Sequence, residues 1–214
     1  GSRAAPSFLT AAWFPELFWD GRARTSFVDP DTGVTVIPNG GALENQALGP
    51  LLASNEMAHD ARLFAEVTTK LVWSKPMALA TNLPADMAAA IAGGATYPQL
   101  FQAAFGTPDI TAQRIAFALA TYQRTLVPNQ TPYDLFVAGN QNALTPQQRN
   151  GLNVFTGPAR CNLCHTPGLF SDGQFRNLGL RPISQDPGRQ AVTGNPADGG
   201  KFTVVAVTPV LSAK

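Results

Sequence analysis

The feature that most constrains this 214-residue chain is one run of five residues, Cys161-Asn162-Leu163-Cys164-His165. The chain has only these two cysteines, which excludes a disulfide framework and a four-cysteine zinc site. Cysteines three positions apart project from one face of a helical turn, so both sulfurs can bond along one edge of a porphyrin. The C-x-x-C-H spacing therefore predicts a covalent haem c, held by Cys161 and Cys164 and ligated at its iron by His165. We also expect the second ring nitrogen of His165 to donate to a backbone carbonyl, which fixes the tautomer.

Two other interpretations of the same residues are weaker. A thioredoxin-like redox pair uses C-x-x-C but requires a βαβ context, and the sequence before Cys161 is helical in pattern. A zinc site would need a fourth ligand, for which His59 is the one remaining histidine. The sixth ligand of the haem iron could be a His or a Met. The candidates are His59, Met57, Met77 and Met87, and the sequence favours none of them, since each is also an ordinary surface or core residue.

Composition limits the class of protein and of partner. The net charge is only +1, so no overall field attracts nucleic acid or anionic lipid. Nearly apolar stretches are broken by Lys, Asp or Pro before the roughly 20 residues that a spanning helix needs, so no membrane span is expected. Charged residues are 14% of the chain, while 18 Pro and 19 Gly interrupt it, which predicts short helices joined by ordered loops.

Helical periodicity dominates the pattern, and strand signals are few. Helices are predicted over 43–53 with an interruption at Pro50, over 59–73, 84–92, 98–105 and 111–126, and from Thr145-Pro146 toward Phe155. Ile115, Leu119, Tyr122 and Leu126 form the expected apolar stripe of the helix at 111–126. The fold class expected is mostly α and loop-rich.

Two segments have a different character. Residues 7–20 hold two Trp and three Phe around Pro15, which predicts a buried aromatic segment broken by a turn. Residues 25–41 have turn dipeptides at both ends of a β-branched stretch, which indicates a small hairpin or an excursion loop that could cover a substrate or partner surface.

Several short runs around the haem motif belong to one pattern. They are LFWDGRA at 17–23, NQALGP at 45–50 with NEM at 55–57, ATYQRTL at 120–126, FTG at 155–157 and FSD at 170–172. In combination, from about residue 5 to 198 and apart from the insertion at 25–41, the chain resembles the bacterial dihaem cytochrome c peroxidases and their MauG-type relatives.

The resemblance implies two c-type cytochrome haem domains. Residues 1–110 would be part of the peroxidatic-haem domain, whose own C-x-x-C-H is not in this chain. Residues 111–214 would be the c-type haem domain with its motif at 161–165, corresponding to the electron-transferring haem. We therefore expect this chain to be a portion of a longer protein with a second haem c, and the distal Met or Tyr ligand of the family to lie further along than Lys214.

The resemblance also assigns roles to three residues. Trp19 matches the tryptophan that the family places between its haems as an electron relay, and Gln46 and Glu56 match the polar pair of the peroxide pocket. A carboxylate at Glu56 could carry a proton between the two peroxide oxygens, with Gln46 orienting the substrate. Without the resemblance, Trp19 would be assigned to the core and the other two to the surface.

The function expected is that of a haem c oxidoreductase that reduces hydrogen peroxide, or uses it to oxidise a substrate, with electrons passed through the His165 haem. The alternatives are a non-enzymatic one-haem electron-transfer cytochrome and a structural fragment. The family implies a small electron-donor protein of cytochrome c or cupredoxin type, a periplasmic location and a homodimer as one allowed assembly. Calcium is in doubt, because Ala4 stands where many relatives have an Asn ligand.

Overall fold

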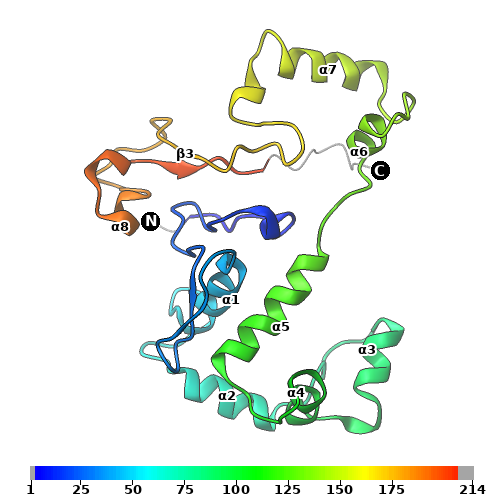
Figure 1. The fold of residues 1–214 in the computed structure, drawn as a ribbon, viewed down its shortest axis with the longest axis vertical. Coiled ribbons are helices and arrows are strands. Elements are labelled where there is room, and N and C mark those ends of the chain that lie inside the picture. Colours follow the sequence, from blue (N-terminus) through cyan, green and yellow to red (C-terminus); the bar gives the residue numbers. More distant parts are fainter. Residues whose placement is uncertain (1–2, 207–214) are drawn as a thin grey trace.

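The computed structural model describes residues 3–206, and helices dominate them (Figure 1). The α-helices are α1 (Ala42–Leu52), α2 (Phe64–Trp73), α3 (Ala85–Ala90), α4 (Tyr97–Phe105), α5 (Ala112–Thr125), α6 (Pro132–Val137), α7 (Pro146–Thr156) and α8 (Gln190–Thr193). Short 3₁₀ turns lie at Ala11–Trp13, Ala92–Gly94, Cys161–Leu163 and Pro196–Asp198. Two antiparallel pairs make up the strands, β1 (Phe27–Val28) with β2 (Thr35–Ile37) and β3 (Phe175–Arg176) with β4 (Phe202–Thr203). The expected mostly α, loop-rich class is confirmed for this part of the chain.

The main core lies where α1 packs against α5, with the β1–β2 hairpin beside them (Figure 1). Phe27 of the hairpin is 1% exposed and lies 6.0 Å, centroid to centroid, from the ring of Phe117 on α5. Asp31, in the hairpin loop, accepts a hydrogen bond of 3.2 Å from the first backbone N–H of α5. The predicted hairpin at 25–41 is therefore confirmed, and it is built into the core.

The remainder of the described chain forms a loop-rich lobe that carries the C-x-x-C-H motif. In Figure 1 the chain leaves α5, passes through α6 and α7, and returns along β3, α8 and β4. Leu144, Phe170 and Val204 are its buried apolar residues. Extended loops between these elements leave few apolar groups to pack, so the lobe has a small core.

Two helix boundaries differ from the prediction. The helix at 43–53 is not interrupted, because Pro50 lies in the last turn of α1, where it removes one backbone hydrogen bond without ending the helix. The helix expected at 59–73 begins only at Phe64. Ala61 has φ of 57°, a left-handed conformation that no α-helix accepts, and Glu66 then caps the new start by accepting a 3.0 Å hydrogen bond from the Leu63 N–H.

Two burial expectations were also wrong. The buried face of α5 comprises Ala112, Ile115, Ala116 and Ala120. Leu119 and Tyr122 of the predicted stripe are 41% and 61% exposed, because α1 approaches the small residues on the adjacent face. The aromatic segment at 7–20 is not uniformly buried either, since its 3₁₀ turn places Ala11 inward and leaves Trp13 exposed.

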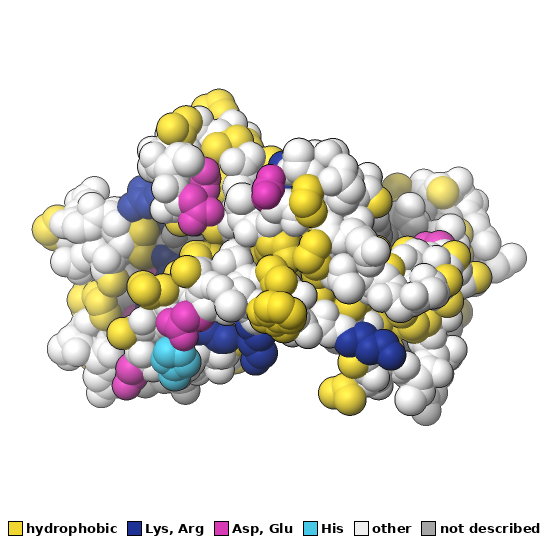
Figure 2. Space-filling view, turned by 90° about the horizontal axis from the view of Figure 1, so that it is seen from below, with side chains coloured by type: hydrophobic (Ala, Val, Ile, Leu, Met, Phe, Trp, Pro, Cys, Tyr) yellow, Lys and Arg dark blue, Asp and Glu magenta, His cyan; other side chains and the backbone are white. Residues whose placement is uncertain are grey.

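The helices with strong local signals lie where the sequence predicts them. Thr96, Thr111 and Thr145 cap α4, α5 and α7, each accepting from the backbone N–H three residues on, and Gly106 ends α4 in a left-handed conformation. The sequence pattern did not predict the short helices α6 (Pro132–Val137) and α8 (Gln190–Thr193). Within residues 3–206 no helix combines the length and the apolarity needed to cross a membrane. Figure 2 shows the end of the molecule near α2 and α4, where hydrophobic side chains gather between charged ones. The most exposed hydrophobic side chains between residues 63 and 90 are those of Leu63, Trp73 and Leu79.

Candidate haem c site and peroxide pocket

The C-x-x-C-H motif forms a single tight turn. Cys161–Leu163 is a 3₁₀ turn, and the Cys161 carbonyl accepts from the N–H of Cys164 at 3.3 Å and from that of His165 at 2.9 Å. Arg160, at φ of 55°, turns the chain out of α7 into this position. Both cysteines are free thiols and half-buried. The motif therefore brings the two sulfurs and the imidazole together on one turn, as covalent attachment requires.

His165 is oriented by the loop that follows it. Its Nδ1 lies 2.9 Å from the carbonyl oxygen of Phe170, and since a carbonyl can only accept, Nδ1 carries the proton. The predicted hydrogen bond to a backbone carbonyl is confirmed, and Nε2 is left as the nitrogen that can bind a metal. The ring of Phe155 lies 6.5 Å from the imidazole and 5.7 Å from that of Phe170, centroid to centroid. The imidazole therefore lies beside apolar aromatic rings.

The donor set fits a covalent haem c. Two thiols on one turn supply the thioether bonds, and Nε2 of His165 supplies an axial ligand.

A second site lies between the N-terminal segment and α1. An open-sided cavity of about 700 Å³ is lined by Trp19, Gln46 and Glu56, which come from three separate segments of the chain. The indole of Trp19 donates to the carbonyl of Ala4 at 2.7 Å, which fixes the ring. On α1, the side-chain oxygen of Gln46 accepts from the amide of Gln123 on α5 at 3.4 Å. The three residues assigned to peroxide chemistry thus share one cavity.

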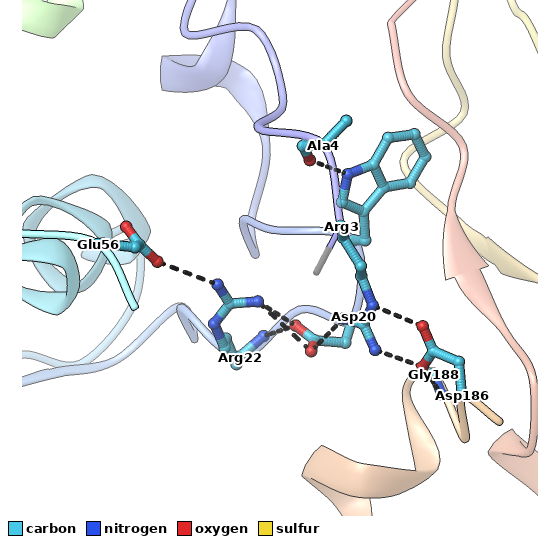
Figure 3. Close-up of polar contacts among 8 residues, drawn as sticks. Arg3, Ala4, Asp20, Arg22, Glu56, Asp186 and Gly188 are labelled. Atoms are coloured by element: carbon cyan, nitrogen blue, oxygen red, sulfur yellow. Dashed lines mark hydrogen bonds and ion pairs between the residues drawn. The ribbon is translucent and has the colours of Figure 1, made fainter. Parts of the chain in front are cut away.

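A chain of ion pairs between acidic and basic side chains lines this cavity (Figure 3). Arg3 donates to Asp186 at 2.9 and 2.6 Å and to Asp20 at 2.5 Å. Asp20 also lies 3.4 Å from the guanidinium of Arg22, whose second nitrogen lies 4.0 Å from the Glu56 carboxylate. Asp20 and Asp186 are both buried, and the two guanidinium groups of Arg3 and Arg22 together balance their two negative charges.

The electrostatics of this network follow from its geometry. The hydrogen bond to Asp186 raises the pKa of Arg3 further above its usual range. In turn, Arg3 lowers the pKa of Asp186 from 3.8 to about 2. Both groups therefore stay charged at neutral pH, and the N-terminal segment is tied to the loop before α8.

The candidate sixth ligands lie away from the attachment motif. His59 is on the surface, with its Nε2 2.9 Å from Glu66; its hydrogen bond to the Asp60 carbonyl and then Glu66 raise its pKa. Met57, Met77 and Met87 are exposed. The helices α2 and α3, which adjoin or carry these residues, lie at the opposite end of the molecule from α7 (Figure 1). The structure brings none of the four to His165.

The sequence pattern did not predict the ion-pair network of the pocket. Arg3 and Asp186 are 183 positions apart, and no short-range pattern pairs them. Asp20 and Arg22 gave a signal only as part of the LFWDGRA run that carried the family resemblance.

Comparison with known proteins agrees with this geometry. The family model for di-haem cytochrome c peroxidase matches residues 1–142. The methylamine utilization protein MauG of Methylophilus methylotrophus is 34% identical over 192 residues, covering 89% of this chain and 45% of that protein. Cytochrome c551 peroxidase of Nitrosomonas europaea is 29% identical over 204 residues, covering 94% and 49%. The chain spans about half the length of the curated relatives it matches.

A solved structure extends the likeness to the fold. The crystal structure of a MauG-like protein associated with microbial copper homeostasis matches with a TM-score of 0.64 at 25% identity, covering 95% of this chain and 54% of that one. The sequence and the fold thus agree along nearly the whole chain, including the C-x-x-C-H motif that lies beyond the residues matched by the family model. The chain belongs to the di-haem cytochrome c peroxidase family, whose members bind covalent haem c.

Proposed function

We propose that this chain is the portion of a periplasmic haem c peroxidase that contains the electron-transferring haem and one wall of the peroxide pocket. The observation that carries the proposal is the convergence of Trp19, Gln46 and Glu56 on one cavity. Residues 1–110 would contribute to the peroxidatic domain and residues 111–214 would hold the haem on His165. The packing of α5 on α1 crosses that boundary, so the two parts would form a continuous scaffold.

Three residues would hold the haem in this chain: Cys161 and Cys164 through thioether bonds and His165 through Nε2. When bound, haem supplies one-electron redox chemistry. The hydrogen bond from His165 Nδ1 to the Phe170 carbonyl would keep the ring in one orientation and increase the electron density at Nε2. Covalent attachment of haem c takes place outside the bacterial cytoplasm, which supports the periplasmic location.

In the pocket, the side chains of the protein would orient the peroxide and transfer a proton. The Glu56 carboxylate would accept a proton from one oxygen of hydrogen peroxide and return it to the other as the O–O bond breaks. Two electrons from the donor protein and two further protons would convert both oxygens to water. The amide of Gln46, steadied by Gln123, would orient the peroxide. Trp19 would act as an aromatic relay for electrons, with its indole fixed by the Ala4 carbonyl. A small cytochrome c or cupredoxin would donate the electrons.

Iron stoichiometry and peroxide turnover of the intact protein test this function. We expect two haems per polypeptide, one of which responds spectroscopically to hydrogen peroxide. The variant Glu56→Gln should slow peroxide turnover by about 10²–10⁴-fold with unchanged haem content, which is the range for loss of a general acid–base group. The matched control is Asp60→Asn, which neutralises an exposed carboxylate outside the cavity.

The outcomes separate the two hypotheses. One low-spin haem that does not respond to peroxide would end the enzyme proposal and leave a one-haem electron-transfer cytochrome. Full activity of Glu56→Gln in a protein that does turn over peroxide would remove only Glu56 from the mechanism.

A further inference from the structure

Phe170, whose carbonyl accepts the hydrogen bond from His165, has an unusual backbone conformation. Its φ is 51°, in the left-handed region that residues with bulky side chains rarely adopt. A conformation of this kind persists only where the surrounding contacts hold it. The contacts of Phe170 therefore decide whether its carbonyl stays on Nδ1 of His165, 2.9 Å away.

The backbone that follows Phe170 is anchored at two points. The hydroxyl of Ser171 donates to the carbonyl of Val204, and the N–H of Asp172 donates to the carbonyl of Cys164 at 2.9 Å. These bonds tie the loop to the attachment motif on one side and to the end of β4 on the other. The carbonyl of Phe170 is thus directed at His165 as long as Phe170 keeps its left-handed conformation.

The side chain of Phe170 is held between two aromatic rings from different helices. It is 7% exposed. The ring of Tyr133, on α6, meets it edge-on at 4.8 Å between centroids, and the ring of Phe155, on α7, does so at 5.7 Å. Edge-to-face contacts at these distances are favourable. Phe155 also lies 6.5 Å from the imidazole of His165, whereas the aromatic contact of Tyr133 is with Phe170.

We infer that Tyr133 and Phe170 are positioning residues for the axial ligand His165. The packing of Tyr133 on Phe170 keeps the Phe170 backbone left-handed and its carbonyl on Nδ1 of His165, and in this way lowers the reduction potential of the haem attached at Cys161 and Cys164. The inference rests on the haem attachment in the proposed function, and it does not depend on peroxide turnover.

The sign of the effect distinguishes positioning from a loosened fold. A carbonyl that accepts from Nδ1 increases the electron density that Nε2 gives to the iron, which favours the oxidised form. Weakening this hydrogen bond should therefore raise the reduction potential. A lobe that is merely loosened would admit water, which favours the more highly charged oxidised iron and lowers the potential.

The first experiment is a spectroelectrochemical titration of the intact, haem-loaded protein with redox mediators. Tyr133→Leu removes the ring that packs on Phe170, and it should shift the reduction equilibrium of one haem by about tenfold toward the reduced form, a rise of 59 mV for one electron. Tyr133→Phe is the matched variant, because it keeps the ring and removes only the hydroxyl. It should have the potential of the wild type.

A second pair of variants tests the backbone conformation. Phe170→Ala and Phe170→Gly remove the same ring, but only glycine adopts a positive φ without steric cost. We expect Phe170→Ala to raise the potential and Phe170→Gly to raise it less, because glycine can keep the carbonyl in place without the ring contacts. Equal shifts in the two variants would overturn the inference, since the left-handed conformation would then have no effect on the haem.

Each result of the first experiment also decides. A higher potential in Tyr133→Leu with an unchanged one in Tyr133→Phe supports the inference. An unchanged or lower potential in Tyr133→Leu overturns it, as does an equal shift in Tyr133→Phe. If Tyr133→Leu attaches no haem, the Phe170 pair decides alone, and failure of all three variants to attach haem overturns the inference, because the rings would then serve folding. A wild-type protein without haem would instead refute the proposed function.

Discussion

The ion pair between Glu44 and Arg124 permits the sharpest test of how the main core is stabilised. Glu44 lies in the first turn of α1, and its side chain is only 3% exposed. Both carboxylate oxygens are held by Arg124 of α5, at 2.7 and 3.1 Å. Substitution Arg124→Met keeps the helix propensity and most of the aliphatic volume, but it leaves a buried carboxylate without its partner.

The expected loss of stability follows from how deeply each side chain of the pair is buried. Removing one partner of a buried ion pair costs about 3–5 kcal/mol. The Arg124 side chain is 42% exposed, so water can reach part of the vacated space, and we expect the lower end, about 3 kcal/mol. Replacing both residues, Glu44→Gln with Arg124→Met, removes the charge as well as its partner, so most of that loss should be recovered.

Chemical denaturation of the haem-loaded protein, followed by far-UV circular dichroism, measures these differences in the free energy of unfolding. Arg149→Met on α7 is the control for loss of an arginine outside the interface, and it should change the stability by less than about 0.5 kcal/mol. A loss below about 1 kcal/mol in Arg124→Met would refute the argument, as would a double variant no more stable than the single one.

Two further predictions concern the junction between the N-terminal segment and the haem lobe. Because Arg3 lowers the pKa of Asp186 from 3.8 to about 2, the pair adds about 2 kcal/mol to the free energy of unfolding above pH 4, and this contribution is lost as the pH falls from 4 toward 2. The acid unfolding of Asp186→Asn should lack this pH-dependent loss of stability. Identical acid unfolding profiles for the variant and the wild type would contradict the prediction. Gly21→Ala should lower the melting temperature measured by calorimetry, because φ is +75° at this position and a Cβ would lie 2.6 Å from the ring of Phe175. A variant with the melting temperature of the wild type would show that the neighbouring side chains move aside.

The sequence alone determined the features that depend on chemistry within a few residues. A threonine followed by helix formers predicted the starts of α5 and α7, and the C-x-x-C-H spacing predicted which residues can attach and ligate a haem. The hydrogen bond from His165 could be predicted for the same reason, because an orienting partner of a ligating imidazole commonly comes from nearby backbone.

Only the tertiary structure decided what lies opposite each residue. The buried face of α5 is the one that packs against α1, and it contains Ala116 and Ala120 rather than the larger Leu119 and Tyr122. The late start of α2 depended on a left-handed residue, Ala61, for which the sequence carries no signal.

The same limit applies to the two sites. Gln46 and Glu56 could be assigned to one pocket only through a family resemblance, and the structure adds Trp19 to the same cavity. The pairing of Arg3 with Asp186, 183 residues away, had no sequence signal at all. Capping and turn preferences are local energies, which a sequence displays directly. Burial and ion pairing between distant segments depend on which surfaces meet, and that is settled only when the whole chain has folded.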